Sequence, residues 1–240
     1  MKPKIISIVG VTAAGKSALA IKLAQEFGGE IISCDSRQVY KGLDIGTAKV
    51  SKEEQVLVRH HLIDIIEPGK VFNVFDFQKM AYAAIDDILS RGKVPILTGG
   101  TGLYSRSVVE GYGFADKPQA KHNVLQICLM PPREVVEPVV IKRIDDRLAQ
   151  GMIEETRELV KKGVPKEWLR SLGLEYFWNV QLIDERINLA EYKQRLKDKT
   201  MQYIKRQRTW FRKEKNTIYL TDPAEFYSQS SKLVKEFLSN

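Results

Sequence analysis

The amino-acid sequence predicts an α/β fold in which helices flank a mostly parallel β-sheet. Short apolar runs suited to strands buried on both faces alternate with helical patterns along the 240 residues. A glycine-rich loop ending in Lys16-Ser17 stands between the first apolar run and the first helical pattern. Apolar residues make up 43% of the chain, which is enough for a proper core. We therefore expect residues 1–240 to form a single P-loop-type catalytic domain, with ligands at the carboxyl ends of the strands.

The spacing of the apolar residues distinguishes the expected strands from the expected helices. Strands are predicted at residues 4–9, 30–34, 94–98, 124–129 and 217–220. Helices are predicted at residues 16–27, 75–91, 101–110, 134–162, 189–212 and 224–238. In a parallel sheet the segments that follow the strands share one edge. The loops after the strands at 4–9, 30–34 and 94–98 should therefore meet over one crevice.

The loop after the first strand has the spacing of a phosphate-binding P-loop, as in P-loop NTPases, and consists of Gly10, Val11, Thr12, Ala13, Ala14, Gly15, Lys16 and Ser17. Gly10 and Gly15 allow the backbone to coil so that successive N–H groups point inward, and the helix that follows adds its positive dipole end. Lys16 brings a cation to the same place, and Ser17 offers a hydroxyl to Mg²⁺. We predict that a phosphate or diphosphate binds here, with Mg²⁺ as cofactor.

Two further segments follow strands at the same edge. The first, residues 35–40, begins with Asp35, which could coordinate Mg²⁺ or take a proton from a nucleophile. The sequence alone leaves both roles open. The second, residues 99–104, combines glycines with the hydroxyl of Thr101 at the start of a helix. It is either a second place for an anion or polar substrate, or a tight turn that Thr101 caps.

A strongly basic segment lies near the C-terminus. Residues 193–215 contain ten Lys and Arg against Asp198 and Glu214, a local net charge of +8 that equals the excess of the whole chain. Apolar residues recur through the segment at roughly helical spacing, so we expect residues 189–215 to form an amphipathic helix with one basic face. A solvated helix would intersperse more acids to make i,i+4 pairs. The pattern favours a polyanion such as RNA as the partner.

Other features narrow the class of protein. Cys34 and Cys128 are the only cysteines, too few for a disulfide framework or a four-ligand zinc site, which fits a reducing compartment. No apolar run reaches membrane-spanning length and no leader pattern follows Met1, so we expect a cytoplasmic protein without a membrane partner. His60 and His61 are adjacent, and their side chains would diverge on a helix or strand. We expect them to be structural or to line the substrate channel.

Five motifs in order give the chain a family resemblance. They are the P-loop, residues 35–49, His60-His61-Leu62-Ile63-Asp64, Gly99-Gly100-Thr101-Gly102-Leu103-Tyr104, and Lys205-Arg206-Gln207-Arg208-Thr209-Trp210-Phe211. Together they resemble the tRNA dimethylallyltransferases, also called isopentenyl-tRNA transferases. The match is close from residue 4 to about residue 104 and looser from about 141 to 212. The resemblance implies transfer of a dimethylallyl group from dimethylallyl diphosphate to the exocyclic N6 amine of an adenosine beside the anticodon, with release of diphosphate.

The resemblance also assigns roles. It implies that Asp35 is the general base, that Thr101 contacts the reacting region and that Lys16 acts with the P-loop on the departing diphosphate. The target nucleotide must leave its stack, and the groups that read it would be Asp35, Ser36, Arg37, Gln38 and Thr101. The residues implied to hold the anticodon stem-loop of the tRNA are Lys205, Arg206, Gln207, Arg208, Thr209 and Trp210. We expect the enzyme to act as a monomer.

The chain departs from the family pattern at several places. Typical members carry a large helical insertion after the Gly-Gly-Thr-Gly-Leu-Tyr helix, whereas here only residues 111–123 fill that gap. Val11 and Ser17 stand where proline and threonine are usual, and Met201 stands where an arginine is frequent. Ser17 keeps the hydroxyl, but Met201 removes a cation. Diphosphate clamping and RNA affinity are the properties that these changes affect.

Three other functions are compatible with parts of the pattern. An adenylate isopentenyltransferase acting on free AMP, ADP or ATP would suit the small size, and a small-molecule P-loop kinase would need a hydroxyl acceptor site. A noncatalytic RNA-binding module would not need an intact P-loop. The basic segment at residues 205–211 favours an RNA acceptor over a free nucleotide.

Overall fold

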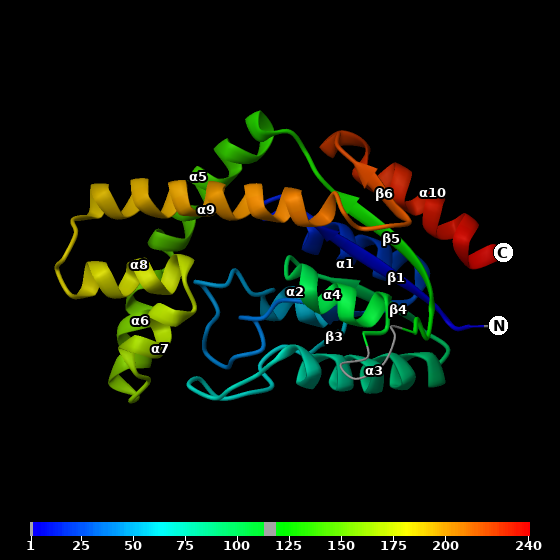
Figure 1. Cartoon of the computed structure of the whole chain (residues 1–240), viewed down its shortest axis with the longest axis horizontal. Helices are drawn as coiled ribbons and strands as arrows, with labels where there is room; N and C mark the ends of the chain where they lie inside the picture. The colour runs from blue at the N-terminus through cyan, green and yellow to red at the C-terminus, as the bar shows by residue number, and fades with distance from the viewer. Residues whose placement is uncertain (1, 113–118) are drawn as a thin grey trace.

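A computed structural model describes residues 2–112 and 119–240. Its core is a parallel sheet of six strands in the order β3-β2-β4-β1-β5-β6 (Figure 1). The strands are β1 Lys4–Gly10, β2 Gly29–Ser33, β3 His60–His61, β4 Val94–Thr98, β5 Asn123–Leu129 and β6 Thr217–Leu220. The helices are α1 Lys16–Phe27, α2 Lys52–Leu57, α3 Val74–Ser90, α4 Gly102–Val109, α5 Arg133–Ala149, α6 Met152–Lys161, α7 Lys166–Ser171, α8 Leu174–Ile183, α9 Leu189–Phe211 and α10 Phe226–Ser239, with a short 3₁₀ turn at Pro223–Glu225.

The parallel α/β architecture and the five predicted strands are confirmed. The predicted helix at residues 134–162 is wrong. The structure divides it into α5 and α6 at Gly151, whose φ of 93° lies in the left-handed region that favours glycine. The elements α2, β3, α7 and α8 were not predicted from the sequence. Part of the shortened connection at 111–123, residues 113–118, lies outside the described residues.

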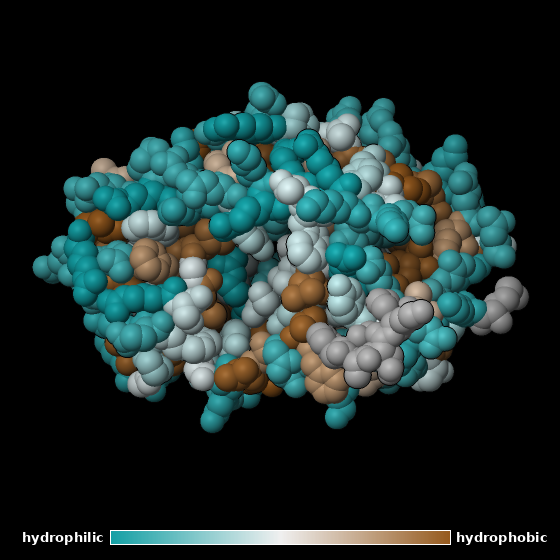
Figure 2. All heavy atoms as spheres, in the orientation of Figure 1, coloured by the Kyte–Doolittle hydropathy of each residue, from teal (hydrophilic) through white to brown (hydrophobic). Residues whose placement is uncertain are grey.

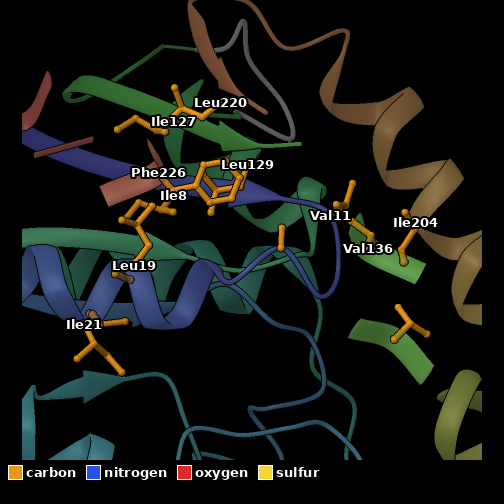
Figure 3. Packing of buried hydrophobic residues seen from close by; sticks show 14 of the residues in the cluster. Ile8, Val11, Leu19, Ile21, Ile127, Leu129, Val136, Ile204, Leu220 and Phe226 are labelled. Carbon is orange, nitrogen blue, oxygen red and sulfur yellow. The ribbon is translucent and has the colours of Figure 1, made fainter. Parts of the chain in front are cut away.

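Two hydrophobic clusters hold the sheet between its helices. One joins the sheet to α1, α5 and α9, with Ile8, Leu19, Val136 and Ile204 among its members (Figure 3). The other lies on the opposite face and packs the sheet against α3 and α4, centred on Phe77. Burial of both faces explains why the strands read as continuous apolar runs.

A separate helical group stands beside the sheet. Helices α5, α6, α7 and α8 gather at the end of the molecule away from the C-terminus, and the long α9 runs from this group back to the sheet (Figure 1). A third cluster packs Val39, Tyr40 and Leu43 of the segment after β2 against Leu159 and Tyr176 of the helical group. This packing places the helical group, α9 and the carboxyl ends of β1, β2 and β4 around one cavity.

Asn188 caps the N-terminus of α9, and its side chain accepts the backbone N–H of Glu191 at 3.0 Å in a capping box. In the orientation of Figure 1, hydrophilic side chains dominate the surface over α9 (Figure 2). Among the described residues, no helix is both long enough and apolar enough to cross a membrane.

Candidate active site

The P-loop is held in shape by its glycines and by β5. Gly10 has a φ of 139°, and a Cβ at this position would overlap the backbone of Leu129. Gly15 has a φ of 82° and caps the N-terminus of α1. Val11 donates its N–H to the Leu129 carbonyl at 3.2 Å and is fully buried. Gly10, Val11 and Ala14 therefore shape the loop from inside the fold.

The other P-loop residues face a cavity of about 400 Å³. Those that line it are Thr12, Ala13, Gly15, Lys16 and Ser17. Lys16 Nζ donates to the Val11 carbonyl at 2.8 Å, so the lysine folds back over its own loop. Burial and, to a smaller extent, nearby Arg143 lower the pKa of Lys16 to about 8, against the opposing effect of Asp35. This is a desolvated cation suited to an arriving anion.

The segment after β2 and the loop after β4 also line this cavity, and they contact each other there. Asp35 Oδ1 accepts the N–H of Arg37 at 2.9 Å, which fixes the carboxylate at the strand end. Thr101 Oγ1 accepts the N–H of Ser36 at 3.1 Å and donates toward Ser36 Oγ at 3.3 Å. Gly99 allows the close approach, because a Cβ there would overlap the backbone of Cys34. Asp35, Ser36 and Thr101 thus lie together on the cavity wall, as the shared sheet edge predicted.

Arg37 and Gln38 also line the cavity, but their side chains form hydrogen bonds with other groups of the protein. Arg37 Nη1 donates to Glu175 at 2.8 Å. Gln38 Oε1 accepts the hydroxyl of Ser33 at 3.0 Å, and its Nε2 donates to the carbonyl of Ala48 at 3.4 Å. Both residues therefore shape the wall as well as facing the cavity.

Glu175, a residue that the sequence did not single out, holds this wall to the helical group. Its buried carboxylate accepts from Arg37 and from Arg147 Nη1 at 2.9 Å, and Arg147 also donates to the Gly46 carbonyl at 3.0 Å. Burial alone would raise the pKa of Glu175, but the two guanidinium groups outweigh it and hold the pKa at about 2. The carboxylate is thus committed to the two arginines as an anion.

Arg143 on α5 is the second functional residue that sequence reasoning missed. It lines the cavity with Lys16 and Asp35, one helical turn before Arg147. Its guanidinium makes no hydrogen bond or ion pair with any part of the chain that the structure describes. Burial lowers the pKa of Arg143, with a further contribution from Arg147. A desolvated guanidinium without an internal partner is a strong candidate for binding phosphate oxygens.

Helix α9 closes the cavity with Thr200, Tyr203 and Gln207. Gln207, which the resemblance placed among the RNA contacts, is buried. Its Oε1 accepts the N–H of Thr12 at 2.8 Å, and its Nε2 donates to the Gly100 carbonyl at 3.0 Å. One amide on α9 therefore connects the P-loop with the loop after β4.

The other predicted RNA contacts on α9 do not line the catalytic cavity. Lys205, Arg206 and Thr209 are exposed. Trp210 is 37% exposed, and its indole lies where a Cβ on Gly102 would be, so the glycine makes room for the ring. The guanidinium of Arg208 donates to the carbonyl of Pro131, so it is less available to RNA than its neighbours.

The adjacent histidines have different surroundings. His61 Nε2 lies 2.8 Å from the Glu30 carboxylate, away from the cavity. His60 Nδ1 pairs with the Val58 carbonyl at 2.7 Å, while its buried Nε2 has no partner among the described residues and its ring lines the cavity. His61 thus has surroundings that fit a structural role, and His60 lies on the cavity wall; these are the two alternatives that the sequence left open.

The fold matches solved structures along nearly the whole chain. The tRNA isopentenylpyrophosphate transferase of Bacillus halodurans superposes with a TM-score of 0.91 at 29% identity, over 99% of this chain and 97% of that one. The tRNA delta(2)-isopentenylpyrophosphate transferase of Staphylococcus epidermidis gives a TM-score of 0.88 at 30% identity, over 98% of this chain and 100% of that one.

Sequence comparison agrees. A tRNA dimethylallyltransferase of Streptococcus agalactiae is 36% identical over 295 residues, which cover 100% of this chain and 99% of the relative. Because that alignment is longer than the 240 residues of this chain, the relative contains residues without a counterpart here. A family model described as IPP transferase matches residues 38–122 and 114–214, two segments that meet at the shortened connection. The chain therefore belongs to the IPP transferase family.

Proposed function

We propose that this protein transfers a dimethylallyl group from dimethylallyl diphosphate to the N6 amine of an adenosine next to the anticodon of a tRNA. The observation that carries the proposal is one cavity lined by the P-loop with Lys16, by the Asp35 carboxylate and by residues of the basic helix α9. The relatives named tRNA dimethylallyltransferase support the same reaction. We further propose that it acts as a monomer, since the described residues of one chain line the cavity, and that it works in the cytoplasm, as the sequence led us to expect.

The leaving group is the diphosphate. As its C1–O bond breaks, negative charge develops on the departing oxygens, and the P-loop N–H groups, Lys16 and Arg143 stabilise it. The N–H of Thr12 is already taken by Gln207, so the donors come from the rest of the loop. This chain has Met201 at a position where an arginine is frequent in relatives. Arg143 on α5 supplies a cation to the cavity.

Ser17 is the residue that would hold Mg²⁺. Its side chain is exposed at the start of α1 and lines the cavity. Within residues 2–112 and 119–240, no group of three His, Cys, Asp or Glu could hold a metal ion. The Ser17 hydroxyl suits Mg²⁺, which takes most of its ligands from water and substrate phosphates. When bound, the ion neutralises charge on the diphosphate.

The nucleophile is the adenine amine. As its nitrogen forms the new bond to C1 of the dimethylallyl group, one N–H proton passes to the Asp35 carboxylate. The Arg37 N–H fixes that carboxylate, while Thr101 and Ser36 lie beside it to orient the base. A stacked base cannot reach this depth, so the nucleotide must leave its stack and enter the cavity.

Product analysis tests the proposal against its alternatives. The protein would be incubated with radiolabelled dimethylallyl diphosphate and, in parallel, tRNA, AMP, ADP or ATP. We expect label only in the tRNA, on an adenosine beside the anticodon. Label in a free nucleotide would make it an adenylate isopentenyltransferase. Absence of label in all acceptors, with phosphoryl transfer from ATP to a small molecule, would identify a kinase.

Replacing Arg143 tests whether this residue is a second cation, besides Lys16, that stabilises the diphosphate. We expect Arg143→Ala to lower kcat/KM for dimethylallyl diphosphate about 30- to 160-fold, because loss of one charge-stabilising donor costs about 2–3 kcal/mol. Arg143→Lys should recover part of that loss. Lys142→Ala is the matched control, since Lys142 lies on the same helix but is exposed and pairs with Asp146 at 2.7 Å. Equal kinetics in Arg143→Ala and the control would remove Arg143 from the site.

The salt dependence of tRNA binding tests the basic helix. Lys205→Gln with Arg206→Gln should weaken binding and flatten the slope of log K against log salt by about 1.4, the value for two contacts to single-stranded phosphates. Arg208 is left in place because its guanidinium serves the Pro131 carbonyl. The control pair is Lys232→Gln with Lys235→Gln, two exposed lysines on α10. If both pairs change the slope equally, α9 has no special part in RNA binding.

A further inference from the structure

A second groove opens beside the catalytic cavity, between α8 and α9. Its volume is about 510 Å³, and three of its lining residues, Ser36, Arg37 and Tyr203, also line the catalytic cavity. Hydrophobic atoms bordered by hydrophilic ones show between α8 and α9 on this face (Figure 2). We call it the α8–α9 groove. A group in it would lie directly next to whatever occupies the catalytic cavity.

Aromatic rings form much of this groove. Phe177 and Trp178 pack edge to face, with ring centroids 4.9 Å apart at 85°. Tyr203 lies on the α9 side, and the guanidinium of Arg206 lies over its ring at 5.8 Å from the ring centroid. Trp178 is nearly buried, whereas Phe177 and Tyr203 are half-buried and present ring surface. Such rings are platforms on which a nucleobase stacks.

The charges of the groove are of one sign. Lys199 and Arg206 stand on its α9 side with Arg37 at the junction to the catalytic cavity, and none of the described lining residues is acidic. Arg37 is committed to Glu175, but the only partner of Lys199 Nζ in the described structure is Gln202 at 3.3 Å. Arg206 makes no ion pair within the described part of the chain. Two cations beside aromatic rings match a nucleotide, with a flat base and an anionic phosphate.

We infer that the α8–α9 groove binds the nucleotide that directly flanks the target adenosine on the same RNA strand. This inference rests on the proposed function. Extruding one base from a loop also exposes the face of its neighbour, and stacking of that neighbour on Phe177 and Tyr203 compensates for the lost contact. Lys199 and Arg206 bind the connecting phosphates. The groove thereby helps to hold the RNA in a chain whose connection at 111–123 is short.

Fluorescence of 2-aminopurine tests this placement. Anticodon stem-loops would carry 2-aminopurine either immediately 5′ or immediately 3′ of the target adenosine, and would be titrated with protein in the absence of dimethylallyl diphosphate. We expect a marked change in emission on binding for one of the two positions. Phe177→Leu, which keeps apolar volume but removes the ring, should reduce that change and raise KM for the stem-loop about tenfold. Its affinity for inorganic diphosphate should equal that of the parent.

Two comparisons make the outcome decisive. Tyr227→Leu removes a partly exposed ring from α10, away from the groove, and should leave both the emission change and KM unaltered. Arg206→Gln should weaken stem-loop binding without abolishing the emission change. No change at either position, or the same change in Phe177→Leu as in the parent, overturns the inference even if tRNA is prenylated. An emission change that needs Phe177, in a protein that does not prenylate the RNA, overturns the proposed function alone.

Discussion

Lys16→Ala is expected to reduce kcat/KM for dimethylallyl diphosphate at least a hundredfold while the chain still folds. Removing a cation that stabilises the departing diphosphate costs about 3 kcal/mol or more. Among the described residues, Lys16 Nζ donates to one carbonyl, that of Val11 in its own loop, and its lowered pKa shows that burial disfavours the charge in the folded protein. Loss of the charge therefore removes a binding interaction without removing one that stabilises the fold.

The same lysine makes diphosphate binding dependent on pH. Because the pKa of Lys16 is about 8 in the ligand-free protein, the lysine loses its proton as the pH rises through this value, and diphosphate must then bind to a neutral amine. The affinity of the parent for inorganic diphosphate should fall about tenfold more between pH 7 and pH 9 than that of Lys16→Ala. Calorimetric titration of both proteins at the two pH values measures the difference.

Thermal unfolding and a neighbouring variant control this experiment. Lys22→Ala removes an exposed lysine from the same helix and should behave as the parent in both assays. Turnover by Lys16→Ala within tenfold of the parent would contradict the assignment of residues 10–17 as the diphosphate site. A large fall in the unfolding temperature of Lys16→Ala would show that the lysine serves the fold instead.

The meeting of the three loops was predictable from the sequence because it depends on topology alone. Parallel strands place the segments that follow them at one edge, so Lys16, Asp35 and Thr101 had to lie near one another once the strands were recognised. The strands themselves were recognised because burial on both faces makes them continuous apolar runs. Local chemistry and strand direction were sufficient for this part of the site.

The contributions of α5 and α9 were not predictable in the same way. Which face of a helix points inward depends on what packs against it, and the sequence does not show that Arg143 and Gln207 face the cavity. From the sequence alone, a basic or amide side chain is expected to be exposed to solvent. The break at Gly151 was missed for a related reason, because a glycine within a helical pattern either ends the helix or is tolerated.

Glu175 illustrates a limit of motif reasoning. It lies in a stretch without a catalytic signature, yet its carboxylate joins Arg37 from the segment after β2 to Arg147 from α5. These partners lie 138 and 28 residues away along the chain, so they leave no local pattern. Only the fold shows that one buried carboxylate pairs with two arginines and so keeps the cavity wall together.

Asp35→Asn is expected to lower the rate of prenyl transfer about 10²–10⁴-fold while diphosphate affinity stays unchanged. Asparagine has nearly the same shape, and its carbonyl oxygen can still accept the Arg37 N–H that holds the side chain in place. The amide cannot take the proton from the adenine amine at neutral pH. Single-turnover transfer to tRNA measures the rate, and titration with inorganic diphosphate and Mg²⁺ measures binding.

The two readouts separate the two roles that the sequence left open for Asp35. A general base acts only in the chemical step, so its loss should leave the affinities for diphosphate and Mg²⁺ as they are. A metal ligand contributes before that step, so its loss would lower Mg²⁺-dependent diphosphate affinity together with the rate. Asp86→Asn, at an exposed position on α3, controls for the loss of one negative charge. If affinity and rate fall together only in Asp35→Asn, Asp35 is a metal ligand and the proton acceptor lies elsewhere in the cavity.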